Sequence, residues 1–255
     1  MGGAIAEGLV ALDGVDVTIV EADPERAHWW RSRGDVDVAD LGAAIADADV
    51  VFLAVKPHQV AETLRSLREA LRPGAVVVSI AAGITVDAIE QELPEGTSVI
   101  RTMPNTPVRV GRGVVGLCAG HACSSDDVEV VTGLLSRVAL VVPIAEGSLD
   151  ALTATSGSGP AYLFYLAEAM TLGAIDLGLP EKTANALVAH TLAGAAELLL
   201  AEPDKAVELR ASVTSKGGTT AAATSVFDHA DLRGMVVAAM RANRDRAREM
   251  AEGTP

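Results

Sequence analysis

The stretch D-V-V-F-L-A-V, residues 49–55, gives the clearest indication of the fold. Its apolar residues follow one another almost without a break, which is typical of a strand buried on both faces of a parallel sheet. Residues 60–71 have apolar side chains at helical spacing instead. A strand followed by a helix is the repeating unit of an α/β domain, so this part of the chain predicts a βαβ arrangement.

Similar apolar runs occur before and after this stretch, at residues 15–20, 75–80, 98–103 and 139–144. We therefore predict an α/β fold, with a Rossmann-type domain on a parallel sheet over residues 1–146. After Gly147 the strand pattern stops, and residues 147–255 predict an all-helical domain. Its expected helices cover residues 159–178, 181–201, 205–212, 217–229 and 231–250.

Composition restricts the possible partners. The formal net charge is −14, which argues against nucleic acid or an anionic membrane, because both attract basic surfaces. We find no apolar run long enough to span a bilayer and no signal peptide, so we expect a cytoplasmic protein. Cys118 and Cys123 fit neither a disulfide framework nor a zinc site, and no other cluster has metal-ligand spacing.

The helices of the second domain indicate an oligomer. Residues 186–200 are apolar on more than one face, and a helix of this kind needs cover on every side. About five helices in one small domain cannot provide that cover alone. We therefore expect a second copy of the chain to provide it.

The segment S-V-T-S-K-G-G-T-T-A-A-A-T-S-V-F-D, residues 212–228, places small residues at a predicted helix start. Gly217 and Gly218 leave the N–H groups of the first turn accessible, and the positive end of the helix dipole favours an anion such as a carboxylate. Ser215, Thr219 and Thr220 add hydroxyl groups. The alternative is an ordinary Ser/Thr helix cap.

Four further motifs accompany this segment: A-V-K-P-H at 54–58, A-A-G-I-T at 81–85, M-P-N-T-P at 103–107 and S-G-S-G-P-A-Y at 156–162. With these motifs, residues 1–250 resemble the pyrroline-5-carboxylate reductases. The resemblance implies reduction of 1-pyrroline-5-carboxylate to L-proline by NAD(P)H, the last step of proline synthesis. It also implies a homodimer with intertwined C-terminal helices, and in some members a larger ring of dimers.

The start of the chain departs from the usual dinucleotide-binding pattern, which is a strand, then G-x-G-x-x-G, then a helix. Gly2 takes the position of the last glycine, so the first strand and two leading glycines are missing before Met1. We expect either that the true start lies upstream or that the chain is a damaged reductase. A truncated, non-catalytic homologue is therefore an alternative function. Met1 and Gly2 remain candidates for cofactor binding.

Glu21 follows the second strand of the pattern at about the separation expected for a carboxylate that binds the ribose 2′-hydroxyl. A carboxylate repels a 2′-phosphate, so Glu21 favours NADH over NADPH. The alternative is that Glu21 or Asp23 only caps the next helix. Arg26 and Arg31 are available to a phosphate, so the expected cofactor is NAD(P)H.

The resemblance also assigns residues to the nicotinamide and its ribose. These are Ala54, Val55, Lys56, Pro57, Ala81, Ala82, Gly83, Pro104 and Asn105, contacting mainly through the backbone and the Asn105 side chain.

A cyclic imine carboxylate needs its carboxylate held and its nitrogen polarised. We assign the amides near Gly218 and Thr219 to the carboxylate, and the Thr220 hydroxyl to the imine nitrogen as the catalytic group. The proton then comes from water or from substrate that is already protonated, and no metal is required.

Two points remain open. Similar reductases usually carry proline where this chain has Lys216, which either assists the carboxylate or is a tolerated surface change. A second alternative is a β-hydroxyacid dehydrogenase, which uses a lysine on the long interdomain helix. Residues 159–177 contain no lysine, which argues against that alternative.

Overall fold

The computed structural model describes residues 1–251 and divides into two compact units. Unit 1 consists of Met1–Ser158 together with the chain from Asn243 on, and unit 2 consists of Gly159–Ala242. The domain boundary expected between residues 146 and 147 stays a prediction, because units defined by contacts and domains defined by sequence pattern need not coincide.

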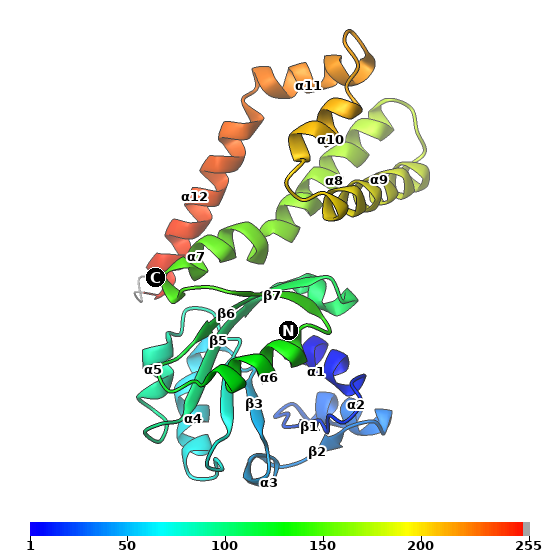
Figure 1. The fold of residues 1–255 in the computed structure, drawn as a ribbon. Coiled ribbons are helices and arrows are strands. Elements are labelled where there is room, and N and C mark those ends of the chain that lie inside the picture. Colours follow the sequence, from blue (N-terminus) through cyan, green and yellow to red (C-terminus); the bar gives the residue numbers. More distant parts are fainter. Residues whose placement is uncertain (252–255) are drawn as a thin grey trace. The chain divides into compact units, whose positions relative to one another are not determined.

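Unit 1 contains a five-stranded sheet and a separate two-stranded sheet (Figure 1). In spatial order the larger sheet consists of β3 (Val50–Leu53), β4 (Val76–Ser79), β5 (Ser98–Pro104), β6 (Gly113–Ala119) and β7 (Ala139–Pro143). The smaller sheet pairs β1 (Thr18–Ile19) with β2 (Asp37–Val38) in parallel. All five predicted apolar runs contain strands, and no strand precedes the first helix in the described residues.

We predicted a parallel sheet, but the larger sheet is mixed. Its β3–β4, β4–β5 and β6–β7 pairs are parallel, whereas β5 and β6 are antiparallel. The sequence did not predict β6 at all. A short connection, which includes the 3₁₀ helix Thr106–Val110, joins β5 to β6, and a connection of this length permits antiparallel pairing without a crossover helix.

Helices cover both faces of this sheet. On one side lie α1 (Gly2–Val10) and α6 (Ser125–Leu135), and on the other lie α3 (Leu41–Ala46), α4 (Val60–Arg68), α5 (Val86–Glu90) and α7 (Leu149–Leu152). The remaining helix of this part, α2 (Pro24–Arg33), connects β1 to β2. Because successive side chains of a strand point to opposite faces, Val77 packs with Leu64 in one core, while Val78 packs with Ile5 and Leu135 in the other.

The two cysteines are free thiols, one buried and one half-buried. Cys118 and Cys123 form no disulfide, and burial raises the pKa of each thiol. A raised pKa keeps the thiols protonated and unreactive at neutral pH.

Unit 2 is helical, as predicted. It contains α8 (Gly159–Asp176), α9 (Glu181–Ala201), α10 (Ala206–Ser212), α11 (Thr219–His229) and the first half of α12 (Leu232–Ala251). The turn between α8 and α9 contains Gly178, which has a φ of 95° that glycine adopts without strain. Pro180 follows and is the N-cap of α9.

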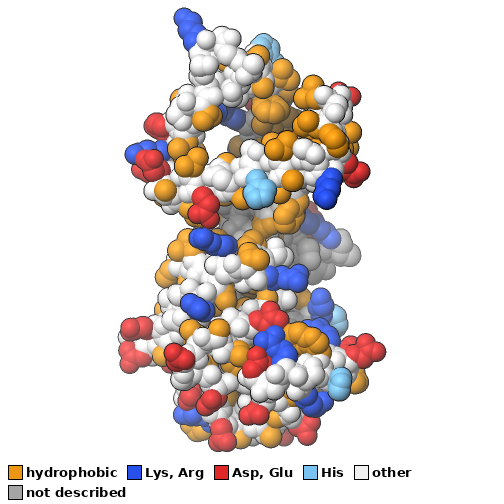
Figure 2. All heavy atoms as spheres, turned by 90° about the vertical axis from the view of Figure 1, so that its right-hand side faces the viewer, with side chains coloured by type: hydrophobic (Ala, Val, Ile, Leu, Met, Phe, Trp, Pro, Cys, Tyr) orange, Lys and Arg blue, Asp and Glu red, His pale blue; other side chains and the backbone are white. Residues whose placement is uncertain are grey.

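The helices of unit 2 bury few of their apolar side chains. Figure 2 shows hydrophobic side chains gathered at the surface of these helices. The exposed ones include Phe164, Tyr165, Leu166, Leu198, Leu200 and Val226. An exposed apolar surface of this extent is typical of a subunit interface.

The expectation that no apolar run is long enough to span a bilayer is wrong as stated. The α9 helix is long and apolar enough to cross a bilayer by length and composition, although this is weak evidence for a span. A soluble oligomer offers a sufficient alternative, because a partner subunit can cover the same apolar surface.

A glycine in α1 gives a test of packing in unit 1. A methyl group on Gly8 would overlap the Cγ1 atom of buried Val138, whereas one on Gly133 in α6 would meet nothing within 4 Å. Relative to Gly133→Ala, we expect Gly8→Ala to lower the free energy of unfolding by about 1–3 kcal/mol through overpacking. Urea denaturation measures the difference. Equal midpoints would contradict the packing of α1 on this face.

Candidate active site

The candidate cofactor residues of unit 1 lie where strands of the larger sheet end. Ala54–Pro57 follow β3, Ala81–Gly83 lie just after β4, and Asn105 follows β5. Because these three strands are parallel to one another, their carboxyl ends lie at one edge of the sheet. Ligands of open α/β sheets bind at this edge.

The amino end of α1 lies at the same edge. A Cβ atom built on Gly2 would be 2.6 Å from the Cβ of Ala54, so only glycine allows the helix to approach this closely. The N–H groups of Ala4 and Ile5 donate to the carbonyl of Met1. Among the described residues, the N–H groups of Gly2 and Gly3 have no acceptor. Two free amides at a helix start are suited to a phosphate.

Buried polar residues fix the strand ends behind these segments. The Ser79 hydroxyl accepts a hydrogen bond from the Ala81 N–H at 3.2 Å, and the Thr102 hydroxyl donates to the Ser79 carbonyl at 3.0 Å. Ser79 and Thr102 are almost completely buried. These bonds restrict the start of the Ala81–Gly83 loop, where Gly83 has a φ of 77°. The loop is therefore preorganised before any ligand binds.

Asn105 makes structural contacts that the sequence did not predict. Its Oδ1 atom accepts from the Val114 N–H at 2.8 Å, and its Nδ2 atom donates to the Ser156 carbonyl at 3.0 Å. The side chain thus joins β6 to the S-G-S-G-P-A-Y segment. A carboxamide has one further donor and further acceptor capacity, so the predicted contact between Asn105 and the cofactor stays a prediction.

Glu21 lies just after β1, with its side chain 19% exposed. One carboxylate oxygen accepts from the Asp23 N–H at 3.1 Å, and the other lies 3.2 Å from the Nε atom of Arg26. Asp23 is the residue that caps α2, since its carboxylate accepts from the N–H groups of Glu25 and Arg26. The capping role therefore belongs to Asp23, and the ribose contact of Glu21 stays a prediction.

The candidate substrate residues of unit 2 form the turn between α10 and α11. Gly217 has a φ of 73°, which favours glycine, and Gly218 is the N-cap of α11. A Cβ atom on Gly218 would overlap the Ser215 hydroxyl oxygen. Both glycines are thus required by the turn, as the sequence indicated.

The amides of this turn are not all available. The Gly218 N–H donates to the Ser215 carbonyl at 3.0 Å, so it is already bonded. Among the described residues, the N–H groups of Thr219 and Thr220 and the hydroxyls of Ser215 and Thr220 have no partner. Thr220 is half-buried and Thr219 exposed. The free donors begin at Thr219, one residue later than the first amide that we assigned to the carboxylate.

A partly buried ion pair in unit 1 was not apparent from the sequence. Arg101 donates to the Glu146 carboxylate at 2.7 Å, and the same oxygen accepts from the Val86 N–H at 2.8 Å. Glu146 thereby links β5 to the first residue of α5, which follows the Ala81–Gly83 loop.

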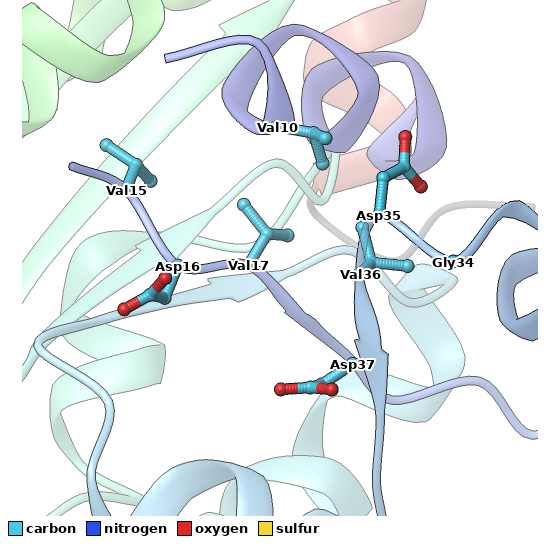
Figure 3. Close-up of a pocket in the computed structure, with 8 residues that line it drawn as sticks. All are labelled: Val10, Val15, Asp16, Val17, Gly34, Asp35, Val36 and Asp37. Atoms are coloured by element: carbon cyan, nitrogen blue, oxygen red, sulfur yellow. The ribbon is translucent and has the colours of Figure 1, made fainter. Parts of the chain in front are cut away.

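A pocket of about 230 Å³ lies at the amino ends of β1 and β2 (Figure 3). Its lining includes three carboxylates, those of Asp16, Asp35 and Asp37. The Arg33 guanidinium donates to both oxygens of Asp35 and holds the pKa of that carboxyl below its usual value. A lining with three carboxyl groups does not suit a phosphate, and the pocket lies at the amino ends of its strands, so it does not belong to the candidate cofactor site.

Comparison with known proteins identifies the family. Residues 146–250 match the family described as pyrroline-5-carboxylate reductase dimerisation, and residues 1–83 match NADP oxidoreductase coenzyme F420-dependent. A pyrroline-5-carboxylate reductase of Corynebacterium melassecola is 38% identical over 258 residues, covering 99% of this chain and 96% of that protein. The chain belongs to the pyrroline-5-carboxylate reductase family.

Other members of the pyrroline-5-carboxylate reductase family agree with this assignment. The protein of Pseudomonas aeruginosa is 39% identical, with 99% of this chain and 92% of that one covered. The structure of a reductase from Coxiella burnetii matches with a TM-score of 0.91 at 34% identity, over 97% of this chain and 94% of that one. The matching dimerisation domain supports oligomerisation.

Proposed function

We propose that the protein reduces 1-pyrroline-5-carboxylate to L-proline in the cytoplasm, with NAD(P)H as the hydride donor. The observation that carries this proposal is the turn of residues 215–220, which offers free amides and hydroxyls at a helix start. Relatives that match almost the full chain are named pyrroline-5-carboxylate reductases, which supports this function over that of a β-hydroxyacid dehydrogenase.

The substrate carboxylate would bind at the amino end of α11. The free N–H groups of Thr219 and Thr220 and the helix dipole both favour a negative charge there. The Thr220 hydroxyl then donates to, or accepts from, the imine nitrogen according to whether the substrate is neutral or protonated. Holding the ring in one orientation accounts for much of the expected acceleration.

The cofactor would bind at the carboxyl edge of the larger sheet in unit 1. The free amides of Gly2 and Gly3 would donate hydrogen bonds to the pyrophosphate, and segments Ala54–Pro57 and Ala81–Gly83 would line the nicotinamide and its ribose. NAD(P)H supplies the hydride when bound. The residues of the chain orient it and exclude water.

Assembly follows from the exposed apolar surface of unit 2. We propose a homodimer in which these helices cover one another, and a larger ring of dimers as a further state. The exposed apolar faces of α8 and α9 would then be buried in the interface.

Steady-state assays test the reaction. We expect oxidation of NAD(P)H only when pyrroline-5-carboxylate is added, with proline as the product. Turnover of hydroxyacids without a response to the cyclic imine would instead favour the dehydrogenase alternative.

The cofactor preference has its own test. We propose that Glu21 makes NADH the better cofactor by binding the ribose hydroxyls and repelling a 2′-phosphate. Glu21→Ser would remove that repulsion and release Arg26, which is 65% exposed, toward the phosphate. We expect the ratio of kcat/KM for NADPH to that for NADH to rise about five- to tenfold, or about 1–1.4 kcal/mol.

Asp23→Ser is the matched control for this change. It removes one negative charge nearby but leaves a residue that caps α2 well. We expect the cofactor ratio of this variant to stay near that of the parent. Equal ratios for Glu21→Ser and the parent would limit Glu21 to holding the loop before α2.

A further inference from the structure

Asp87, Glu90 and His121 form a cluster outside the candidate active site. Their potential metal-binding atoms all lie within 4.8 Å of one another. Asp87 and Glu90 are three residues apart on α5, so they project from the same side of the helix. His121 comes from the turn between β6 and α6, more than 30 residues away along the chain. The cluster thus joins two separate segments of unit 1.

The backbone brings His121 to α5 by a close approach. The Gly120 N–H donates to the Val99 carbonyl at 2.8 Å, and a Cβ atom on Gly120 would lie 2.7 Å from that oxygen and overlap a Glu90 oxygen. Only glycine fits there. The same Glu90 oxygen, Oε1, accepts from the His121 N–H at 2.8 Å. Glu90 is therefore held in place by the turn that carries the imidazole.

The other Glu90 oxygen faces the imidazole. The distance from its Oε2 atom to the Nδ1 atom of His121 is 2.8 Å, and Asp87 Oδ1 lies 3.8 Å from the same nitrogen. Ligand atoms around tetrahedral Zn²⁺ lie about 3.3–3.5 Å apart, given bonds of about 2.0–2.2 Å. Small rotations of Asp87 and His121, whose side chains are 68% and 79% exposed, would produce this spacing.

The charge of the cluster also favours a cation. The carboxylate oxygens of Glu90 and Asp87 lie 2.8 and 3.8 Å from the Nδ1 atom of His121. Two carboxylates therefore stabilise a positive charge at the imidazole nitrogen. A divalent cation held between these groups would be stabilised by the same two carboxylates.

We propose that Asp87, Glu90 and His121 bind Zn²⁺ or a similar divalent transition-metal ion. One nitrogen and two carboxylate oxygens suit this class of metal better than Mg²⁺ or Ca²⁺, which prefer oxygen ligands alone. Three protein ligands leave a position for water. Glu90 and His121 also line a groove of about 390 Å³, together with Pro94 and Thr97.

A metal ion at this place would connect α5 to the turn after β6. Only Ile84 and Thr85 separate the α5 helix from the Ala81–Gly83 loop. Bound metal would therefore restrain the helix that follows a candidate cofactor loop. The proposal concerns binding and stabilisation and does not depend on the reaction that the protein catalyses.

Titration of chelator-treated full-length protein with Zn²⁺ tests the site, with Co²⁺ absorption as a second readout of coordination. We expect one site in the micromolar range and a higher melting temperature with metal. His121→Ala should weaken binding at this site about 100-fold or more, and Asp87→Asn about tenfold, because even partners of metal ligands contribute about 10- to 100-fold. Both residues are exposed, so both variants should fold.

His28→Ala provides the matched control, because it removes an exposed histidine of α2 that belongs to no such cluster within residues 1–251. We expect this variant to bind metal as the parent does. Identical stoichiometry and affinity in the parent and His121→Ala would overturn the proposal, as would the absence of binding by the parent. In either case the cluster is a surface ion pair only.

Discussion

Replacing Thr220 by alanine is expected to lower kcat about 10- to 100-fold. The half-buried Thr220 hydroxyl has no partner among the described residues and lies on the first turn of α11. Losing one hydrogen bond to a charge-bearing nitrogen costs about 1.5–3 kcal/mol, which corresponds to that change in rate. The affinity for NAD(P)H, measured by titration, should hardly change.

Thr220→Ser is the control for this prediction. Serine keeps the hydroxyl and loses only a methyl group, so it should retain most of the activity. If the alanine variant turned over at the parental rate, the role at the imine nitrogen would pass to Ser215 or to solvent. A loss of activity in both variants would point to the methyl group and hence to packing.

The second large effect is expected at the start of α1. A methyl group on Gly2 would lie 2.6 Å from the Cβ of Ala54 and would push the helix away from the end of β3. The free amides of Gly2 and Gly3 would move with it. We expect Gly2→Ala to weaken NAD(P)H binding about tenfold or more, which corresponds to about 1.4 kcal/mol. Titration of the cofactor measures this directly.

Gly3→Ala separates this effect from a general disturbance of the helix. A Cβ atom on Gly3 would lie 3.4 Å from Trp30, which is an ordinary contact. The variant should bind the cofactor nearly as the parent does. If the two variants bound NAD(P)H equally well, the close approach of α1 to Ala54 would have no part in the cofactor site.

The sequence predicted the strands and helices whose residue pattern is continuous along the chain. Strands β3 and β4 are almost uninterrupted runs of Val, Phe and Leu. Helix α9 begins just after Pro180 and ends shortly before Pro203. Such elements depend on local pattern and turn chemistry, which a single sequence contains. The same holds for the 215–220 turn, where two adjacent glycines mark the helix start.

Strand β6 could not be recognised in the same way. Its seven residues include Gly113 and Gly116, and glycine weakens the strand pattern. The structure explains why both positions are glycine. A side chain at Gly113 would overlap Val108, and one at Gly116 would approach Leu152 within 2.6 Å. These contacts depend on the tertiary fold, so they produce no periodic pattern in the sequence. Strand β2, with two residues, is too short to show one.

The contacts that support the candidate site were also beyond the sequence. Arg101 and Glu146 are 45 residues apart, and Asn105 and Ser156 are 51 apart. A lone arginine in a strand or an asparagine before a turn has many ordinary roles. Only the folded arrangement of β5 and the segments after β7 brings each pair together.

Transfer of an isotope label tests the central claim most directly. The protein would be incubated with pyrroline-5-carboxylate and NAD(P)H that carries deuterium at the transferred position of the nicotinamide. We expect L-proline with one deuterium at its δ carbon, formed in equal amount to the oxidised cofactor. Oxidation of the cofactor without labelled proline, or the absence of any transfer at saturating substrate, would contradict the proposed reaction.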